Sequence, residues 1–281
     1  MPESLISNVS DTARWVAVYR ALETARSDAL FKDPYADRLA GERGRAIAQI
    51  APKQMRNGWP LILRTKLMDD LIEQSIKEGC DLVLNLAAGF DARPYRLSLP
   101  ASLSWVEADL PPMIEEKEAL LAGEKPACRL TRVKVDLADG PARSAFLKSV
   151  LGSAQRALVI TEGLLGYLDA EVVASLGRDL LSRSEIRWWL LDVASPVILQ
   201  MVLKGMGAHL ANAPFKFAPP NGLAFFEALG WKAQDVRSVF PEAVRARRVP
   251  FFLRLFALLP EPDPRNLGKA RWSAVVRLER P

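Results

Sequence analysis

Histidine and cysteine are scarce in this chain of 281 residues, which contains one histidine, His209, and two cysteines, Cys80 and Cys128. Two thiols so far apart in sequence provide neither a cluster of zinc ligands nor a disulfide framework, so we expect no bound metal. We interpret both as small buried thiols, as a reducing cytoplasm allows. With one histidine in the chain, chemistry that needs a histidine base has a single candidate.

Long apolar runs are also missing. A transmembrane helix needs about 18 or more consecutive apolar residues, whereas the segment 249-VPFFLRLFALLP-260 is shorter and is interrupted by Arg254. The N-terminus has no basic stretch followed by an apolar one, so it does not predict a signal peptide. We therefore expect a cytoplasmic protein with no membrane partner.

Positive charge is in modest excess, with a formal net charge of +5 and a pI of about 9.3. The lysines and arginines are spread along the chain, so this excess is only a weak indication of nucleic-acid binding. The one dense basic cluster is 245-RARRVPFFLR-254. We interpret it as a solvated basic face beside a buried apolar helix.

The sequence does contain a regular alternation of strands and helices from residue 81 onward. Five nearly continuous apolar runs predict strands buried on both faces of a parallel sheet, at residues 81–87, 103–109, 129–136, 156–161 and 186–193. Helical segments lie between them, at residues 94–99, 111–123, 141–152 and 169–183. This order predicts a doubly wound, Rossmann-like α/β sheet with helices on both faces. A late pair of strands, residues 231–236 and 271–280, completes a sheet of seven strands, six parallel and one antiparallel.

Helices are expected before the sheet as well, at residues 11–25, 34–41, 43–50 and 61–79. We expect residues 1–60 to form a helical cap and residues 61–281 the main domain, the two making one structural unit. Residues 195–226, rich in Met, Phe and Pro, are interpreted as an insertion above the sheet that covers the substrate.

Acidic residues stand at or just after the ends of the predicted strands, at the edge where ligands bind in such sheets. They are Asp91, Glu107, Asp109, Asp136, Glu162 and Asp192. The first strand ends in Ala87-Ala88-Gly89, whose small side chains let a ligand approach the backbone. Asp109, about 20 residues further on, suits the hydroxyls of a ribose. Asp136 and Leu137 suit an adenine, so an adenosine-bearing ligand is expected.

The charge pattern favours one adenosine ligand over another. A nicotinamide dinucleotide calls for G-x-G-x-x-G, but the chain reads A-A-G-F-D-A and places Asp91 where the pyrophosphate would lie. S-adenosylmethionine has a sulfonium, an ammonium and no phosphate, and its carboxylate calls for an arginine such as Arg64 or Arg93. We therefore predict S-adenosylmethionine. An NAD-type oxidoreductase and a non-catalytic S-adenosylmethionine-binding protein stay open as alternatives.

Several segments together resemble the leucine carboxyl methyltransferase family, in particular its bacterial S-adenosylmethionine-dependent branch. They appear in family order over about 160 residues: 11-DTARWVAVYRALET-24, 27-SDALFKDPYADRLAG-41, 63-LRTKLMDD-70, 84-LNLAAGFDARPYRL-97, 106-VEADLP-111, 135-VDL-137 and 161-TEGLLGYL-168. The resemblance implies a set of cofactor-binding residues, to which we add Leu110 beside Asp109: Arg64, Ala87, Ala88, Gly89, Asp109, Leu110, Asp136, Leu137 and Glu162.

Direct methyl transfer to an oxygen is the expected reaction, with Arg93, Tyr167 and His209 as candidate catalytic residues. A carboxylate acceptor needs no base, and an arginine would orient it; a phenol or alcohol needs one, with His209 or Asp192 as candidates. Thr161-Glu162-Gly163 stands where methyltransferases of exocyclic amines carry N-P-P-Y or D-P-P-Y, which argues against a nucleic-acid substrate. We expect a small-molecule acid or phenol as substrate, and a monomer or homodimer.

Overall fold

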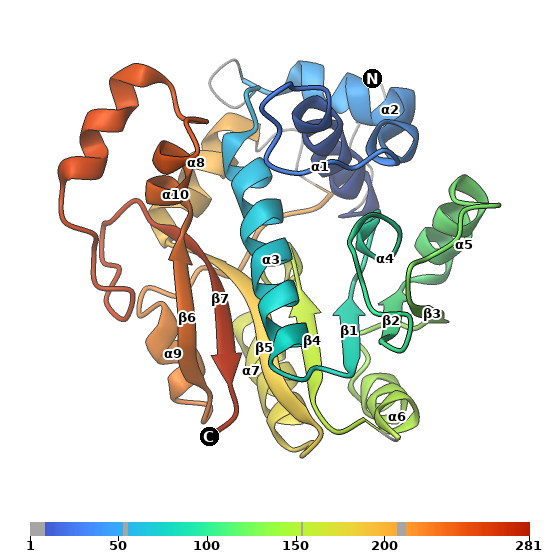
Figure 1. Cartoon of the computed structure of the whole chain (residues 1–281). Helices are drawn as coiled ribbons and strands as arrows, with labels where there is room; N and C mark the ends of the chain where they lie inside the picture. Colours follow the sequence, from blue (N-terminus) through green and yellow to red (C-terminus); the bar gives the residue numbers. More distant parts are fainter. Residues whose placement is uncertain (1–8, 53–55, 153, 207–211) are drawn as a thin grey trace.

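The computed structural model describes residues 9–52, 56–152, 154–206 and 212–281. In these ranges, seven strands form one sheet in the order β3-β2-β1-β4-β5-β7-β6 (Figure 1). Strand β7 is antiparallel to β5 and β6, and the other six strands share one direction. This confirms the predicted sheet. Their bounds are β1 Leu82–Leu86, β2 Ser104–Asp109, β3 Arg129–Lys134, β4 Ala157–Thr161, β5 Ile186–Ala194, β6 Lys232–Ser238 and β7 Ser273–Glu279.

The helices before the sheet agree with the sequence prediction. The two short helices expected at residues 34–41 and 43–50 are both present within α2, where a break at Gly41, whose φ is 59°, separates them. The expected insertion begins with a regular helix, α8. The bounds are α1 Val9–Thr24, α2 Ala36–Ile50, α3 Trp59–Lys77, α4 Arg93–Arg96, α5 Pro111–Leu120, α6 Gly140–Leu151, α7 Ala170–Leu181, α8 Pro196–Met206, α9 Leu223–Glu227 and α10 Val239–Arg245, with 3₁₀ helices η1 Leu165–Tyr167 and η2 Phe251–Leu258.

Both faces of the sheet are covered, which explains the continuous apolar strands. All five residues of β1 are buried. Val83 packs in a cluster with Leu67 and other apolar residues of α3. Leu84 packs in a second cluster with Phe146 of α6 and Val173 of α7. Because the faces are closed, a ligand can reach the sheet only at the strand ends.

The N-terminal helices cover those strand ends. Figure 1 shows α1 and α2 above the carboxyl ends of the parallel strands, with α3 running along one face of the sheet. Trp15 and Tyr19 of α1 share the apolar cluster of α3, and Val18 packs with Leu39 of α2 and Phe90. Helix α1 is therefore held by apolar contacts on both sides, directly above the turn after β1.

The segment expected to form a buried apolar helix does not do so. Residues 251–258 form η2, and none of its residues is buried. Phe251 is 81% exposed and Leu258 is 82% exposed. The expectation of a buried helix is therefore wrong for this segment. None of the helices in the described ranges has the length and apolarity needed to cross a membrane.

Candidate cofactor and active site

A cavity of about 490 Å³ lies between the carboxyl ends of the strands and α1. This volume falls within the range of small-molecule sites. Every predicted site residue in the described ranges lines it, whereas His209 lies outside those ranges. The lining set contains Arg64, Ala87, Ala88, Gly89, Arg93, Asp109, Leu110, Asp136, Leu137, Glu162 and Tyr167.

The turn after β1 has an unusual backbone. Both Ala87, with a φ of 54°, and Gly89, with a φ of 46°, are in the left-handed region. This region costs a residue with a Cβ about 1–2 kcal/mol, so the fold holds Ala87 in a strained conformation. A Cβ added to Gly89 would lie 3.1 Å from the Cβ of Ala13 in α1. The small residues at this turn therefore let the backbone lie close to α1. In the sequence, only Gly89 indicated that the turn could adopt a left-handed backbone.

Asp109 joins the ends of β2 and β1. The Gly89 N–H donates a hydrogen bond to Asp109 Oδ2 at 2.7 Å, and the Leu110 N–H donates to Oδ1 at 2.8 Å. Burial raises the pKa of Asp109, and these two amides oppose the rise. On the neighbouring strand, Asp136 is exposed and accepts a hydrogen bond from the Ala138 N–H at 2.9 Å. Two carboxylates thus stand side by side at adjacent strand ends, as the ribose and adenine prediction requires.

Asp91 is committed to the protein itself. Its carboxylate accepts hydrogen bonds from Asn85 Nδ2 at 2.7 Å, from the Arg93 N–H at 2.9 Å and from Arg93 Nη1 at 2.8 Å. Burial alone would raise the pKa of Asp91, but the charges of Arg93, Lys117 and Arg96, together with the Arg93 N–H, outweigh burial and lower the pKa. The ionised carboxylate of Asp91 accepts the hydrogen bond of the Arg93 N–H at the start of α4. That backbone amide is the one that would otherwise bind a dinucleotide phosphate. This geometry argues against an NAD site, and it also means that Asp91 is neutralised by Arg93.

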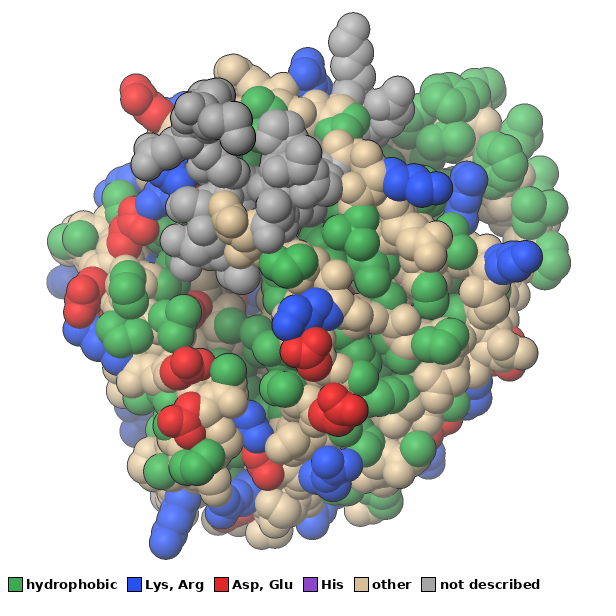
Figure 2. All heavy atoms as spheres, turned by 180° about the vertical axis from the view of Figure 1, so that it is seen from behind, with side chains coloured by type: hydrophobic (Ala, Val, Ile, Leu, Met, Phe, Trp, Pro, Cys, Tyr) green, Lys and Arg blue, Asp and Glu red, His purple; other side chains and the backbone are tan. Residues whose placement is uncertain are grey.

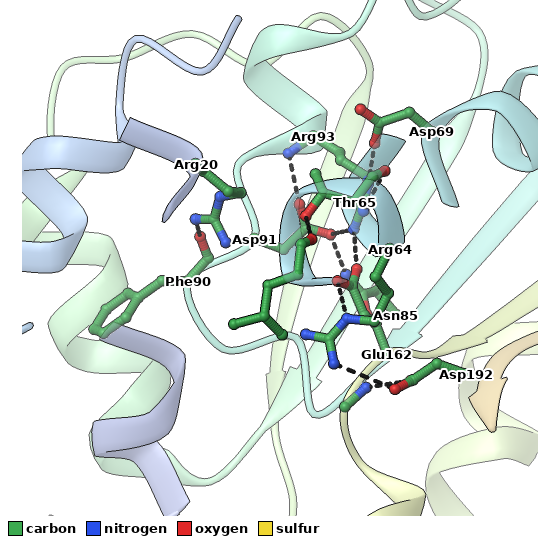
Figure 3. A network of polar contacts seen from close by, with 12 residues as sticks. Arg20, Arg64, Thr65, Asp69, Asn85, Phe90, Asp91, Arg93, Glu162 and Asp192 are labelled. Carbon is green, nitrogen blue, oxygen red and sulfur yellow. Dashed lines mark hydrogen bonds and ion pairs between the residues drawn. The ribbon is translucent and has the colours of Figure 1, made fainter. Parts of the chain in front are cut away.

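Arg93 lies at the centre of a polar network (Figure 3). Its side chain is only 2% exposed, and it contacts three carboxylates: Asp69 at 2.6 Å, Asp91 at 2.8 Å and Glu162 at 2.7 Å. Burial alone would lower its pKa, but the three carboxylates raise it well above the ordinary value. A guanidinium so surrounded has little capacity left for a substrate. We therefore assign Arg93 to positioning Glu162 and Asp91 instead of to catalysis.

Arg64 and Glu162 form the adjoining charged pair. Arg64 Nε lies 3.0 Å from Glu162 Oε1, and Arg64 Nη1 lies 3.2 Å from Asp192 Oδ2. Burial alone would raise the pKa of Glu162, but the charges of Arg93 and Arg64 lower it. Asp192 also accepts a hydrogen bond from the Gly163 N–H at 2.6 Å. A cation and an anion exposed to one cavity can bind the carboxylate and the ammonium of an amino acid. Asp192 as the partner of Arg64 was not predicted, because nothing in its spacing signals that pairing.

Tyr167 connects this charged end to an apolar wall. Its ring stacks on Phe215 with centroids 4.5 Å apart, and its hydroxyl donates to Thr12 Oγ1 at 3.1 Å. Burial raises the pKa of Tyr167, so the phenol is neutral at physiological pH. The structure thus brings Tyr167 into the cavity as a hydrogen-bonding aromatic wall, and its raised pKa makes it a poor base.

The residues of the cavity fit S-adenosylmethionine. Asp109 offers a carboxylate for ribose hydroxyls, while Arg64 and Glu162 offer opposite charges for an amino acid group. Asp91 fills the position where a phosphate would bind. The donor set therefore suits a nucleoside joined to an amino acid, without a phosphate between them.

Comparisons with known proteins agree with this chemistry. The sequence profile of the leucine carboxyl methyltransferase family matches residues 13–180. A Frankia alni protein, provisionally named an S-adenosyl-L-methionine-dependent methyltransferase, is 34% identical over 247 residues, covering 79% of this chain and 85% of the relative. A Mycobacterium bovis protein of the same provisional name is 32% identical over 290 residues, covering 98% of this chain and 86% of the relative.

Solved structures share the fold at low sequence identity. A DUF574-family protein from Streptomyces avermitilis has a TM-score of 0.59 at 14% identity, covering 96% of this chain and 97% of that one. A provisionally named methyltransferase from Thermobifida fusca has a TM-score of 0.56 at 15% identity, covering 99% and 98%. Taken with the family match and the cavity, these comparisons show that the chain belongs to the leucine carboxyl methyltransferase family and is an S-adenosyl-L-methionine-dependent methyltransferase.

Proposed function

We propose that the enzyme transfers the methyl group to an oxygen of an apolar small molecule, and that this oxygen belongs to a carboxylate. The apolar wall of the cavity is the observation that carries the proposal. Tyr167 interacts electrostatically with Arg64, and its ring stacks on Phe215, so the apolar surface begins beside the charged end. The wall comprises Trp15, Val16, Leu61, Ile198, Val202, Phe215 and Phe217.

The acid–base properties of the cavity favour a carboxylate over a hydroxyl group. Glu162 has a lowered pKa and is a weak base, whereas Tyr167 has a raised pKa and stays protonated. Asp192 is engaged by the Gly163 N–H and by Arg64. None of these three residues at the charged end of the cavity is therefore poised to remove a proton from an alcohol. A carboxylate is already ionised at neutral pH and needs no base.

The chain contributes mainly by positioning the reactants. When bound, S-adenosyl-L-methionine supplies a methyl group activated by its sulfonium. Arg64 and Glu162 hold the amino acid end, and Arg93 fixes Glu162 through an ion pair. The hydroxyls of Tyr167 and Thr12 are placed to orient an acceptor oxygen. Trp15 and Phe215 exclude water from the apolar end, and such alignment in a dry site supplies much of the acceleration in a direct displacement.

The proposal is tested with a panel of apolar carboxylic acids, each matched to the corresponding alcohol and phenol. Transfer of a labelled methyl group to the acids should give products that release methanol in alkali, as methyl esters do. The rate should show no rising limb near neutral pH, because no base must lose a proton. Products stable to alkali, formed from the alcohols or phenols, would show that the acceptor is a hydroxyl group and would refute the carboxylate assignment.

A further inference from the structure

The segment after α10 exposes a group of large apolar side chains on a protruding part of the molecule. Figure 2 shows hydrophobic side chains gathered there, at the upper right, with Lys and Arg side chains at their base. Single exposed apolar residues are ordinary on protein surfaces, but six within nine residues form a contiguous patch that calls for a partner. The members of this patch are Phe251, Phe252, Leu255, Phe256, Leu258 and Leu259, and each is between 58% and 82% exposed.

The patch is held in place by the rest of the fold. Leu253, on the inner side of η2, packs against the core cluster that also receives Val202 and Phe215 of the cavity wall. Arg254 Nε donates to the Val249 carbonyl at 3.2 Å, and its guanidinium lies 5.8 Å from the ring centroid of Phe251. One side of η2 is thus anchored, and the opposite side presents its apolar residues outward.

Basic residues lie near the patch. Arg247 lies four residues before η2, Arg254 lies within it, and Arg237 and Arg271 lie at one end of the β6–β7 pair. Arg237, Arg247 and Arg271 are exposed and form no ion pair with any described residue. The apolar surface therefore has near it three arginines without an ion-pair partner among the described residues, whereas the exposed carboxylates Glu261 and Asp263 follow it in sequence.

We propose that η2 is a membrane-binding element that inserts its Phe and Leu side chains into the interface of a bilayer containing anionic lipid. Membrane-interface elements combine exposed Phe or Leu with Lys or Arg. Their binding free energy has two favourable contributions, burial of apolar area and electrostatic attraction to anionic headgroups. Arg247 and Arg254 are placed to meet lipid phosphates as the apolar side chains enter. This departs from the expectation of no membrane partner, which rested on the apolar segment being too short, and too interrupted by Arg254, to span a bilayer.

A second copy of the chain fits the patch less well than a membrane does. A stable protein interface uses about 20–30 residues on each side, whereas the patch occupies residues 251–259. A two-fold contact would also bring the same arginines close to their own copies, and like charges would face each other. An anionic bilayer fits both the small size of the patch and its arginines. Its charge is opposite to theirs, and it needs no complementary protein surface.

The test is binding of the full-length protein to vesicles of phosphatidylcholine, with and without phosphatidylglycerol, followed by co-sedimentation. We expect binding to the anionic vesicles only, and weaker binding at higher salt. The combined change Phe251→Ser, Phe252→Ser, Leu255→Ser and Phe256→Ser should abolish binding, whereas Leu22→Ser, at a 54% exposed leucine of α1, should leave it intact. Thermal shifts with S-adenosylhomocysteine confirm that each variant is folded.

Charge is tested separately. The pair Arg247→Gln and Arg254→Gln should weaken vesicle binding about thirty-fold, whereas Lys148→Gln with Arg178→Gln, on α6 and α7, should change it little. No binding to anionic vesicles, or binding that the four apolar substitutions leave unchanged, would overturn the proposal. Light scattering that shows a dimer dissolved by those substitutions would assign the patch to a second copy and would overturn it too.

Discussion

Arg64 of α3 donates a hydrogen bond to Glu162, at the end of β4, over 3.0 Å from Nε to Oε1. The two residues are separated by 98 positions in sequence, and together they present one positive and one negative charge to the same cavity. A zwitterionic amino acid group can bind such a pair with both of its charges satisfied. Glu162 therefore determines two measurable properties, cofactor affinity and the pH dependence of stability.

Glu162→Gln should weaken binding of S-adenosylhomocysteine about 10- to 100-fold, because it removes a charged hydrogen-bond acceptor while keeping the side-chain shape. Isothermal titration calorimetry measures the change. The matched control is Glu115→Gln, at an exposed position on α5 that pairs with Lys134. Equal affinities for the wild type and Glu162→Gln would remove Glu162 from the cofactor site.

The same substitution should alter stability in a pH-dependent manner. Burial would raise the pKa of Glu162, but Arg93 and Arg64 lower it below its ordinary value of 4.5. A lowered carboxylate pKa stabilises the fold above the unfolded value, and this contribution is lost as the pH falls through the folded value. We expect Glu162→Gln to reduce the free energy of unfolding by about 1–3 kcal/mol at neutral pH. The difference from the wild type, measured by urea denaturation, should shrink below about pH 4.5; a difference constant with pH would contradict this.

Ala87→Gly should not destabilise the protein. Ala87 has a φ of 54°, so glycine relieves strain of about 1–2 kcal/mol and offsets its own entropic cost of about 0.5–1 kcal/mol. The free energy of unfolding should stay unchanged or rise by up to about 1 kcal/mol. Ala88→Gly is the matched control, because Ala88 lacks a positive φ and should lose about 1 kcal/mol. Equal losses at the two positions would show that the turn is not strained.

Asp109→Asn should reduce recognition of the ribose. The wild type should bind methylthioadenosine more tightly than its 2′-deoxy analogue, because Asp109 accepts a hydroxyl hydrogen. The variant should bind methylthioadenosine about tenfold more weakly or worse and should discriminate less between the two ligands. Asp139→Asn, which alters the N-cap of α6, serves as the control. Full discrimination by Asp109→Asn in competition titrations would place the ribose elsewhere.

The sheet and the position of the cavity could be predicted because their determinants are local in sequence. A strand buried on both faces must be apolar throughout, as β1 is, and the carboxyl ends of parallel strands meet at one edge. Asp109 ends β2 and Glu162 directly follows β4, so their approach to one cavity follows from strand order alone.

The remaining features depend on contacts between distant segments. Alanine gives no sign that it adopts a positive φ, so the strain at Ala87 was not foreseeable. No ion-pair partner of Arg93 in α3 could be predicted from the sequence, but the packing of α3 against β1 brings Asp69 within 2.6 Å of Arg93. The apolar residues of η2 predicted burial because hydrophobic residues usually are buried, whereas the fold leaves them outside its core.

A crystal structure with S-adenosylhomocysteine tests the central claim most directly, namely that the ends of β2 and β4, on either side of β1, hold the two parts of the cofactor. We predict the ribose hydroxyls on Asp109, the adenine beside Leu137, and the amino acid group between Arg64 and Glu162. Density that placed the nucleoside in another part of the protein, or reversed these two ends within the cavity, would contradict it.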